Sequence, residues 1–133
     1  MTGVFADSLY FFALVNPNDE AHRRAVELSV SLDVPVVTTT WVLTELADGL
    51  SRSSFRKTFS LIVDKFRTDP LNIIVSASDA LFDAGCHLYN ARSDKQWSLT
   101  DCISFVVMRE RGLTDALTGD HHFEQAGFKV LLA

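Results

Sequence analysis

Four acidic residues, Asp7, Glu45, Asp101 and Asp120, stand at positions from which a metal site could be built. Asp7 directly follows the first predicted strand and Asp120 follows the fourth in the segment ALTGD, whereas Glu45 and Asp101 lie near the beginning of predicted helices. Carboxylates that crowd together repel one another and take up protons unless a cation neutralises them. Oxygen ligands favour Mg²⁺ or Mn²⁺ over zinc, and such ions activate water for the hydrolysis of phosphodiesters.

The elements that would position these acids follow from the pattern of apolar residues. Five short apolar runs predict strands over residues 3–6, 35–38, 72–75, 116–118 and 130–132. Helical spacing predicts a helix that opens at Asn18 or Asp19, helices over residues 41–50, 54–66, 79–90 and 100–110, and a helical turn through 121–127. This alternation predicts an α/β fold: one domain over residues 1–133, with a central, mostly parallel five-stranded sheet flanked by helices on both faces.

Apolar faces and caps define several of these helices. The first predicted helix should present an apolar side made of Ala25, Leu28, Val30 and Leu32. The expected N-caps of later helices are Thr39 or Thr40, Ser78, and Ser98 or Thr100. Gly112 is placed to end the last long helix.

We expect the four acids to meet at one edge of the sheet, because parallel strands all end at the same edge and ligands bind outside it. The helix that carries Asp101 should begin there, since its far end leads into the fourth strand. Each acid alone also fits an ordinary role, as a first-turn charge for Asp101 and as a cap or turn residue for Asp7 and Asp120. Glu45 lies in the largely apolar segment WVLTELADGL, where an ionised carboxylate requires a partner.

Asp115 is the alternative to Asp120 for the fourth position. It precedes the fourth predicted strand instead of following it. Asp115 should therefore lie at the opposite edge of the sheet, and we favour Asp120.

Length and composition limit the class of protein. A chain of 133 residues, 47% hydrophobic and 22% charged, has the size and balance of one globular domain. No apolar run approaches the roughly 20 residues that span a bilayer, and the N-terminus lacks the pattern of a signal peptide, so we expect the cytoplasm. The net charge of −5 argues against nonspecific coating of nucleic acid. Cys86 and Cys102 fit free thiols among apolar residues better than a disulfide, a zinc site or a nucleophile.

The ordered motifs resemble the PIN-domain nucleases, and in particular the VapC-type toxins of prokaryotic toxin–antitoxin pairs. The resemblance covers essentially the whole chain, through VFADSLYFFALVNPND, TTTWVLTEL, SLTDCISFVVMRERG and ALTGDHHFEQAGFKVL. It implies a PIN-like domain that hydrolyses RNA with Mg²⁺ or Mn²⁺. Asp7, Glu45, Asp101 and Asp120 match the family's acidic quartet. The resemblance also implies a homodimer and a cognate antitoxin protein.

Four further residues close to the acids take their interpretation from the same resemblance. Thr118 matches the hydroxyl that accompanies the fourth acid, and Ser8 matches a small polar residue after the first. His121 and His122 adjoin Asp120, which suggests a metal or general-base role. We interpret both histidines as structural, because a neighbour of Asp120 need not share its direction and the family pattern uses the His-Phe pair to open a short helix under the sheet.

Basic residues are concentrated beyond the Glu45 helix, in a globally acidic chain. An exposed, solvated helix face is the ordinary explanation for such a group. The sharper hypothesis is that Arg52, Arg56 and Lys57 line the route by which RNA phosphates reach the metal.

Aromatic residues recur at the spacing of a core, so most of them should be buried and not available for base stacking. The residues concerned are Phe11, Phe12, Phe55, Phe59, Phe66, Phe105 and Phe123. A subset around Trp41, Phe55 and Phe59 could instead form an apolar surface, which in this family would be a dimer contact or a groove for a partner helix.

Three other functions are compatible with parts of the pattern. A solitary PIN nuclease in RNA processing would share every residue, and a neighbouring short reading frame for an antitoxin would separate the two possibilities. A receiver-like phosphoacceptor would need paired acids after the first strand and a Lys after the fifth, which this chain lacks. An inactive PIN-like binding module would not need the intact quartet.

Overall fold

A five-stranded parallel sheet forms the centre of the protein in the computed structural model, which describes residues 2–133. Its strands are β1 (Val4–Ala6), β2 (Val36–Thr39), β3 (Ile73–Val75), β4 (Asp115–Leu117) and β5 (Lys129–Val130). Every neighbouring pair is parallel, in the order β3-β2-β1-β4-β5. The predicted α/β fold is confirmed; Met1, which the predicted domain included, lies outside the described residues.

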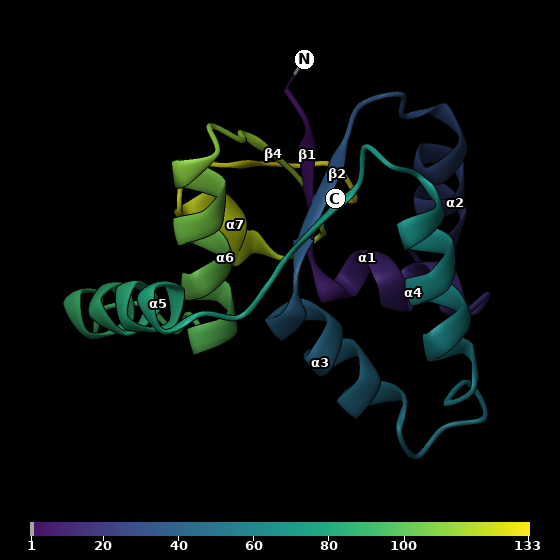
Figure 1. The fold of residues 1–133 in the computed structure, drawn as a ribbon, viewed down its shortest axis with the longest axis horizontal. Helices are drawn as coiled ribbons and strands as arrows, with labels where there is room; N and C mark the ends of the chain where they lie inside the picture. The colour runs from purple at the N-terminus through teal and green to yellow at the C-terminus, as the bar shows by residue number, and fades with distance from the viewer. Residues whose placement is uncertain (1) are drawn as a thin grey trace.

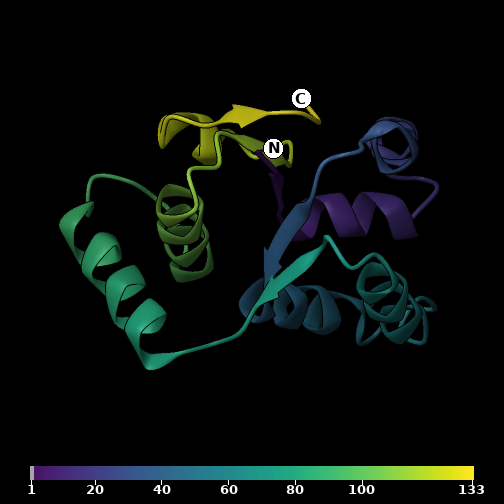
Figure 2. The same cartoon turned by 45° about the horizontal axis from the view of Figure 1, so that its top comes forward.

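Seven helices occur in the described part of the chain and cover both faces of the sheet. They are α1 (Ser8–Val15), α2 (His22–Ser31), α3 (Thr40–Leu50), α4 (Thr58–Thr68), α5 (Asp79–Ala91), α6 (Leu99–Glu110) and α7 (His121–Gln125). Figures 1 and 2 show α1, α2 and α4 on one side of the sheet and α5 and α6 on the other. Helices α1 and α3 begin directly after β1 and β2, and α6 begins near the same edge (Figure 1).

Helix α1 was not among the predicted helices. Its sequence, SLYFFALV, has apolar residues all around the helix and therefore no amphipathic period. The structure explains this composition, because Tyr10, Phe11 and Ala13 are buried and the helix packs against both α2 and α3.

The prediction that the next helix opens at Asn18 or Asp19 is wrong, because α2 begins at His22. Asp19 instead stabilises a turn, in which its side chain accepts a hydrogen bond of 2.8 Å from the backbone N–H of Ala21. The predicted apolar side is correct for Ala25 and Leu28, which are buried, but wrong for Val30, which is 82% exposed.

The helix predicted over residues 54–66 begins later, at Thr58, and extends to Thr68. Residues 51–57 form turns, in which the side chain of Ser53 accepts from the backbone N–H of Phe55. A local hydrogen bond of this kind competes with helix formation.

The other predicted helix boundaries agree more closely with the structure. Thr39, Ser78 and Ser98 are N-caps whose side chains accept backbone hydrogen bonds. Gly112 follows α6 with a φ of 68°, which favours glycine. Helix α5 packs chiefly on α6, at Gly85, where a Cβ atom would lie 2.3 Å from Ile103 Cγ1.

Aromatic side chains fill much of the core, as predicted. Phe11, Phe66, Phe105 and Phe123 are buried. Trp41, Phe55 and Phe59 are each partly buried, and Phe55 and Phe59 pack against the core, so the predicted contact surface around them stays a prediction. Both cysteines are free thiols, and burial raises the pKa of Cys102 to about 11.

An apolar groove lies elsewhere, between α1, α2 and α4, with a volume of about 650 Å³. Leu14, Val30, Ile62 and Phe66 are among the side chains that line it, and Lys65 adds a positive charge. We refer to it as the α2–α4 groove. Within residues 2–133, no helix is both long enough and apolar enough to cross a membrane.

Candidate metal centre

Asp7 is held in a buried position at the end of β1. Asp7 is only 3% exposed, and its backbone N–H donates a hydrogen bond of 3.3 Å to the carbonyl oxygen of Leu117 on β4. The pKa of Asp7 is raised to about 7, chiefly by burial and to a smaller extent by the charges of Asp101 and Glu45, against the lowering effect of a hydrogen bond from Thr118. The ionised form of Asp7 is therefore unfavourable unless a cation lies close to it.

Thr118 connects Asp7 to Asp120. This fully buried hydroxyl donates to Asp7 Oδ2 at 2.9 Å and accepts from the backbone N–H of Asp120 at 3.1 Å. Asp120 is the N-cap of α7, where its Oδ1 accepts from the backbone N–H of His122 at 2.9 Å. The carboxylates after β1 and β4 are thus positioned by one hydrogen-bonded chain.

Glu45 reaches the same edge from α3. The hydroxyl of Ser8, the first residue of α1, donates a hydrogen bond to Glu45 Oε1. Glu45 is exposed, so the expectation that it lies in an apolar setting is wrong. The apolar neighbours Leu43 and Leu46 point into the core on the other side of the helix.

Asp101 caps α6 and also lies close to Asp120. It closes a capping box with Ser98, because its backbone N–H donates to Ser98 Oγ at 3.0 Å and its Oδ2 accepts from the Ser98 backbone N–H at 3.3 Å. Its side chain is 13% exposed. Burial raises the pKa of Asp101 and the charge of Asp120 raises it further, so the carboxylate that caps α6 also belongs to the acidic cluster.

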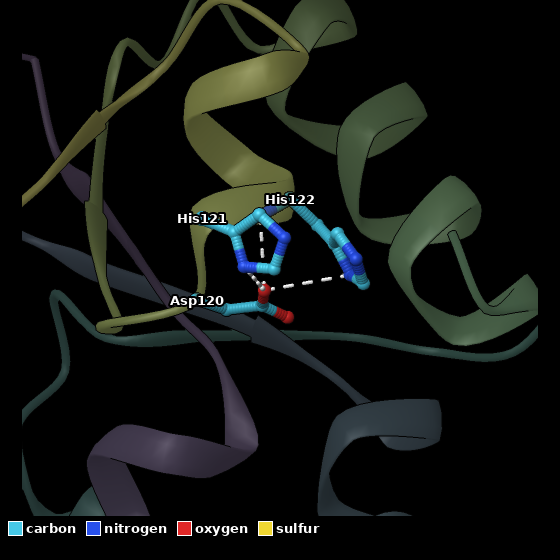
Figure 3. Close-up of side chains that lie close together, drawn as sticks. All are labelled: Asp120, His121 and His122. Carbon is cyan, nitrogen blue, oxygen red and sulfur yellow. Dashed lines mark hydrogen bonds and ion pairs between the residues drawn. The ribbon is translucent and has the colours of Figure 1, made fainter. Parts of the chain in front are cut away.

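His122 also belongs to this site, which corrects our structural interpretation of it. Its Nδ1 lies 3.4 Å from Asp101 Oδ2 and 3.4 Å from Asp120 Oδ1, and its side chain is 21% exposed. The neighbouring His121 is 70% exposed in its side chain, with Nδ1 3.7 Å from the same oxygen of Asp120 (Figure 3). Only Phe123 of this segment packs beneath the sheet. The sequence pattern could not show this, because α7 has only five residues and its spacing does not fix the direction of the His122 side chain.

Asp115 lies where its position before the strand predicted. It is the first residue of β4, pairs with Lys129 of β5 and accepts a hydrogen bond from the Thr114 hydroxyl at 3.1 Å. Because Asp120 follows the other end of the same strand, the choice of Asp120 over Asp115 agrees with the structure.

The three basic residues lie beyond the far end of α3. Arg52, Arg56 and Lys57 are all exposed in the connection to α4, and Arg56 Nη1 donates to the backbone oxygen of Ser51 at 2.9 Å. Their role toward RNA stays a prediction.

The donor set fits a hard divalent cation. Asp7, Glu45, Asp101 and Asp120 supply carboxylate oxygens from four elements at one edge, and oxygen is the donor that Mg²⁺ and Mn²⁺ prefer. Over residues 2–133, the ion pairs of these acids are with histidines and not with lysine or arginine. A bound cation would supply the missing positive charge that the raised pKa values of Asp7 and Asp101 reflect.

Solved structures with this fold are PIN-domain proteins. The crystal structure of VapC20 from Mycobacterium tuberculosis, a toxin that cleaves the sarcin–ricin loop, has a TM-score of 0.83 at 26% identity, over 94% of this chain and 95% of that one. DNA-bound VapBC from Salmonella typhimurium has a TM-score of 0.66 at 16% identity, over 98% of this chain and 97% of that one. VapBC2 from Rickettsia felis has a TM-score of 0.68 at 14% identity, over 97% of both chains. The chain therefore has a PIN-like fold, with its acidic residues near the edge at which the parallel strands end.

Sequence similarity identifies a relative among these proteins. The 23S rRNA-specific endonuclease VapC20 of M. tuberculosis, from strains CDC 1551 and H37Rv, is 26% identical over 125 residues, which cover 94% of this chain and 95% of that protein. No protein-family model matches the chain. Over almost its whole length the chain is similar in sequence and in fold to VapC-type PIN-domain proteins. The sheet order also excludes the receiver-like alternative, since such domains have the order 2-1-3-4-5.

Proposed function

We propose that the protein is an endoribonuclease that depends on Mg²⁺ or Mn²⁺ and is the toxin of a toxin–antitoxin pair. The observation that carries the proposal is the buried Asp7, linked through Thr118 to Asp120 and repelled by Asp101 and Glu45. A group of carboxylates without a lysine or arginine partner among the described residues is costly to the apo protein, and a bound cation would offset this cost.

In this proposal Asp7, Glu45, Asp101 and Asp120 hold the ion. The ion supplies an activated water and stabilises the charge that develops on the leaving oxygen of the phosphodiester. Thr118 and Ser8 are positioning residues, because their hydroxyls orient Asp7 and Glu45 respectively. No side chain needs to act as a nucleophile.

RNA is the proposed substrate because VapC20, which aligns along almost the whole chain, is an rRNA endonuclease. The exposed cations Arg52, Arg56 and Lys57 are the proposed contacts to the RNA backbone. They lie on the connection that follows α3, the helix that carries Glu45, so RNA phosphates held there could extend along α3 toward the acids.

A cognate antitoxin is the proposed protein partner. Similar folds have been solved as VapBC assemblies, and FitAcB from Neisseria gonorrhoeae, with a TM-score of 0.66, is a further structure with this fold. The α2–α4 groove fits an amphipathic segment of such a partner, because Val30 and Leu14 offer apolar contacts and Lys65 offers a cation. Co-purification with the product of a neighbouring short reading frame should be lost in Val30→Glu and retained in Leu71→Glu, an exposed residue outside the groove.

A homodimer completes the proposal. Phe82 and Tyr89 are 44% and 50% exposed on α5, which packs chiefly on α6 and leaves its outer face open. Light scattering after gel filtration should give the mass of a dimer for the wild type and that of a monomer for Phe82→Glu/Tyr89→Glu.

Incubation of the purified protein with structured and single-stranded RNAs tests the function. Cleavage should require Mg²⁺ or Mn²⁺, stop in EDTA and fall at least about a hundredfold in Asp7→Asn. His87→Ala, on the exposed surface of α5, is the matched control and should cleave like the wild type. Cleavage that persists in EDTA would contradict the metal-dependent mechanism.

A further inference from the structure

Three consecutive side chains at the beginning of α7 form a compact group of metal-ligating atoms. One ligand atom each from Asp120, His121 and His122 lies within 4.8 Å of the other two. Figure 3 shows both imidazole rings turned toward the carboxylate of Asp120. In the proposed nuclease mechanism only Asp120 has a role, so the two histidines remain unexplained.

The separations match those between the ligands of a tetrahedral metal. A Zn²⁺ ion bound about 2.0–2.2 Å from each ligand requires ligand atoms roughly 3.3–3.6 Å apart. The Nδ1 atom of His122 lies 3.4 Å from Asp120 Oδ1, within this range, and that of His121 lies 3.7 Å from the same oxygen, just beyond it. A charge-assisted hydrogen bond between imidazolium and carboxylate would instead be about 2.7–2.9 Å long. The group is therefore too open for two direct hydrogen bonds and of the right size for one ion.

The surroundings suit an ion that arrives from solvent. His122 and Asp120 are mostly buried, with side chains 21% and 22% exposed, so they are held in place. His121 is 70% exposed and leaves the approach open. Three protein ligands leave the fourth position of a tetrahedron to water.

The nitrogen ligands decide which ion binds. Imidazole suits Zn²⁺, Co²⁺ and Ni²⁺, whereas Mg²⁺ takes oxygen ligands and keeps several waters. We infer that Asp120, His121 and His122 form a second cation site, which takes a transition metal such as Zn²⁺ and shares Asp120 with the carboxylate pocket.

This shared ligand has a consequence that depends on the proposed function. An ion held by the two histidines engages Asp120 and draws its carboxylate away from the pocket of Asp7 and Asp101. Zn²⁺ should therefore inhibit RNA cleavage supported by Mg²⁺. His121→Ala should relieve this inhibition, because His121 touches Asp120 and not Asp101.

Co²⁺ is the probe for the site itself, because its visible absorption reports its ligands without any RNA. The apo protein is titrated with Co²⁺ in a large excess of Mg²⁺, which occupies the carboxylate pocket. We expect one bound Co²⁺ with the absorption of a four-coordinate ion, displaced by Zn²⁺. His121→Ala and His122→Ala should each weaken binding at least about tenfold, and His87→Ala should bind like the wild type.

Two results would overturn the inference. One is equal Co²⁺ affinity in the wild type and the double variant His121→Ala/His122→Ala. The other is the absorption of a six-coordinate Co²⁺ ion, which would indicate a site of oxygen ligands and water instead of the histidines. Co²⁺ binding as described, in a protein that cleaves no RNA, would contradict the proposed function and leave this site intact. RNA cleavage without histidine-dependent Co²⁺ binding would support the proposed function and contradict the second cation site.

Discussion

Thr118 donates its hydroxyl hydrogen to Asp7 Oδ2 across 2.9 Å, from the segment after β4 to the end of β1. The hydroxyl oxygen of Thr118 also accepts a hydrogen bond from the backbone N–H of Asp120, so a single buried side chain helps to position two acids. Residues 111 positions apart are thereby joined in one site.

Thr118→Val should destabilise the protein by about 1–3 kcal/mol. Valine has the shape of threonine but leaves the buried Asp7 carboxylate and the Asp120 N–H without their partner. Unfolding in urea measures the change. Thr118→Ser keeps the hydroxyl and should recover most of the lost stability; an equal loss in both variants would show that the methyl group matters instead of the hydrogen bonds.

Asp7 should make the apo protein less stable as the pH rises. Its pKa is about 7 in the folded protein and 3.8 as an ordinary value, so the folded state binds the proton more tightly than the unfolded state. The resulting stabilisation is fully present below 3.8 and is lost as the pH rises through 7, by at most about 1.4 kcal/mol per pH unit.

Unfolding of the apo protein in EDTA at a series of pH values tests this dependence. Asp7→Asn cannot titrate, so its stability should vary less between pH 4 and pH 7 and exceed that of the wild type at the upper end. The same pH dependence in both proteins would contradict the raised pKa of Asp7.

Much of this site could be predicted because its residues are tied to local signals. Asp7, Asp101 and Asp120 follow strands or begin helices, and the edge at which parallel strands end is common to all of them. The position of His122 could not be predicted, because it depends on the direction of a side chain in the first turn of the five-residue helix α7. Helix α1 was missed for another reason: contact with α2 and α3 removes the polar face from which amphipathic helices are recognised. The exposure of Val30 depends on the open α2–α4 groove, which only the packing of separate helices creates.

Ser8→Ala should weaken Mn²⁺ binding about tenfold without unfolding the protein. The Ser8 hydroxyl orients Glu45, and loss of such a supporting hydrogen bond leaves the ligand present but misplaced. Thr44→Ala, on the exposed face of α3 next to Glu45, is the control and should bind Mn²⁺ like the wild type. Calorimetric titration measures both affinities, and unchanged binding in Ser8→Ala would remove the positioning role.

Charge reversal at Arg56 and Lys57 should weaken RNA binding and lower its dependence on salt. Each lost phosphate contact reduces the slope of log Kd against log salt by about one. The measurement is made in EDTA, so that the RNA stays intact. Arg23→Glu/Arg24→Glu, an equal change of charge on exposed α2, should leave the slope unchanged. Equal effects of the two double variants would indicate a response to net charge alone.

The count and affinity of bound Mn²⁺, read from the electron paramagnetic resonance of the free ion, test the carboxylate pocket most directly. The titration is made in the His121→Ala/His122→Ala background, so that only oxygen ligands remain. We predict that Asp7→Asn, Glu45→Gln, Asp101→Asn and Asp120→Asn each lower the affinity at least about tenfold, because all four acids hold the same ion. Mn²⁺ binding by Asp7→Asn and Asp101→Asn that equals the parent protein would contradict the account.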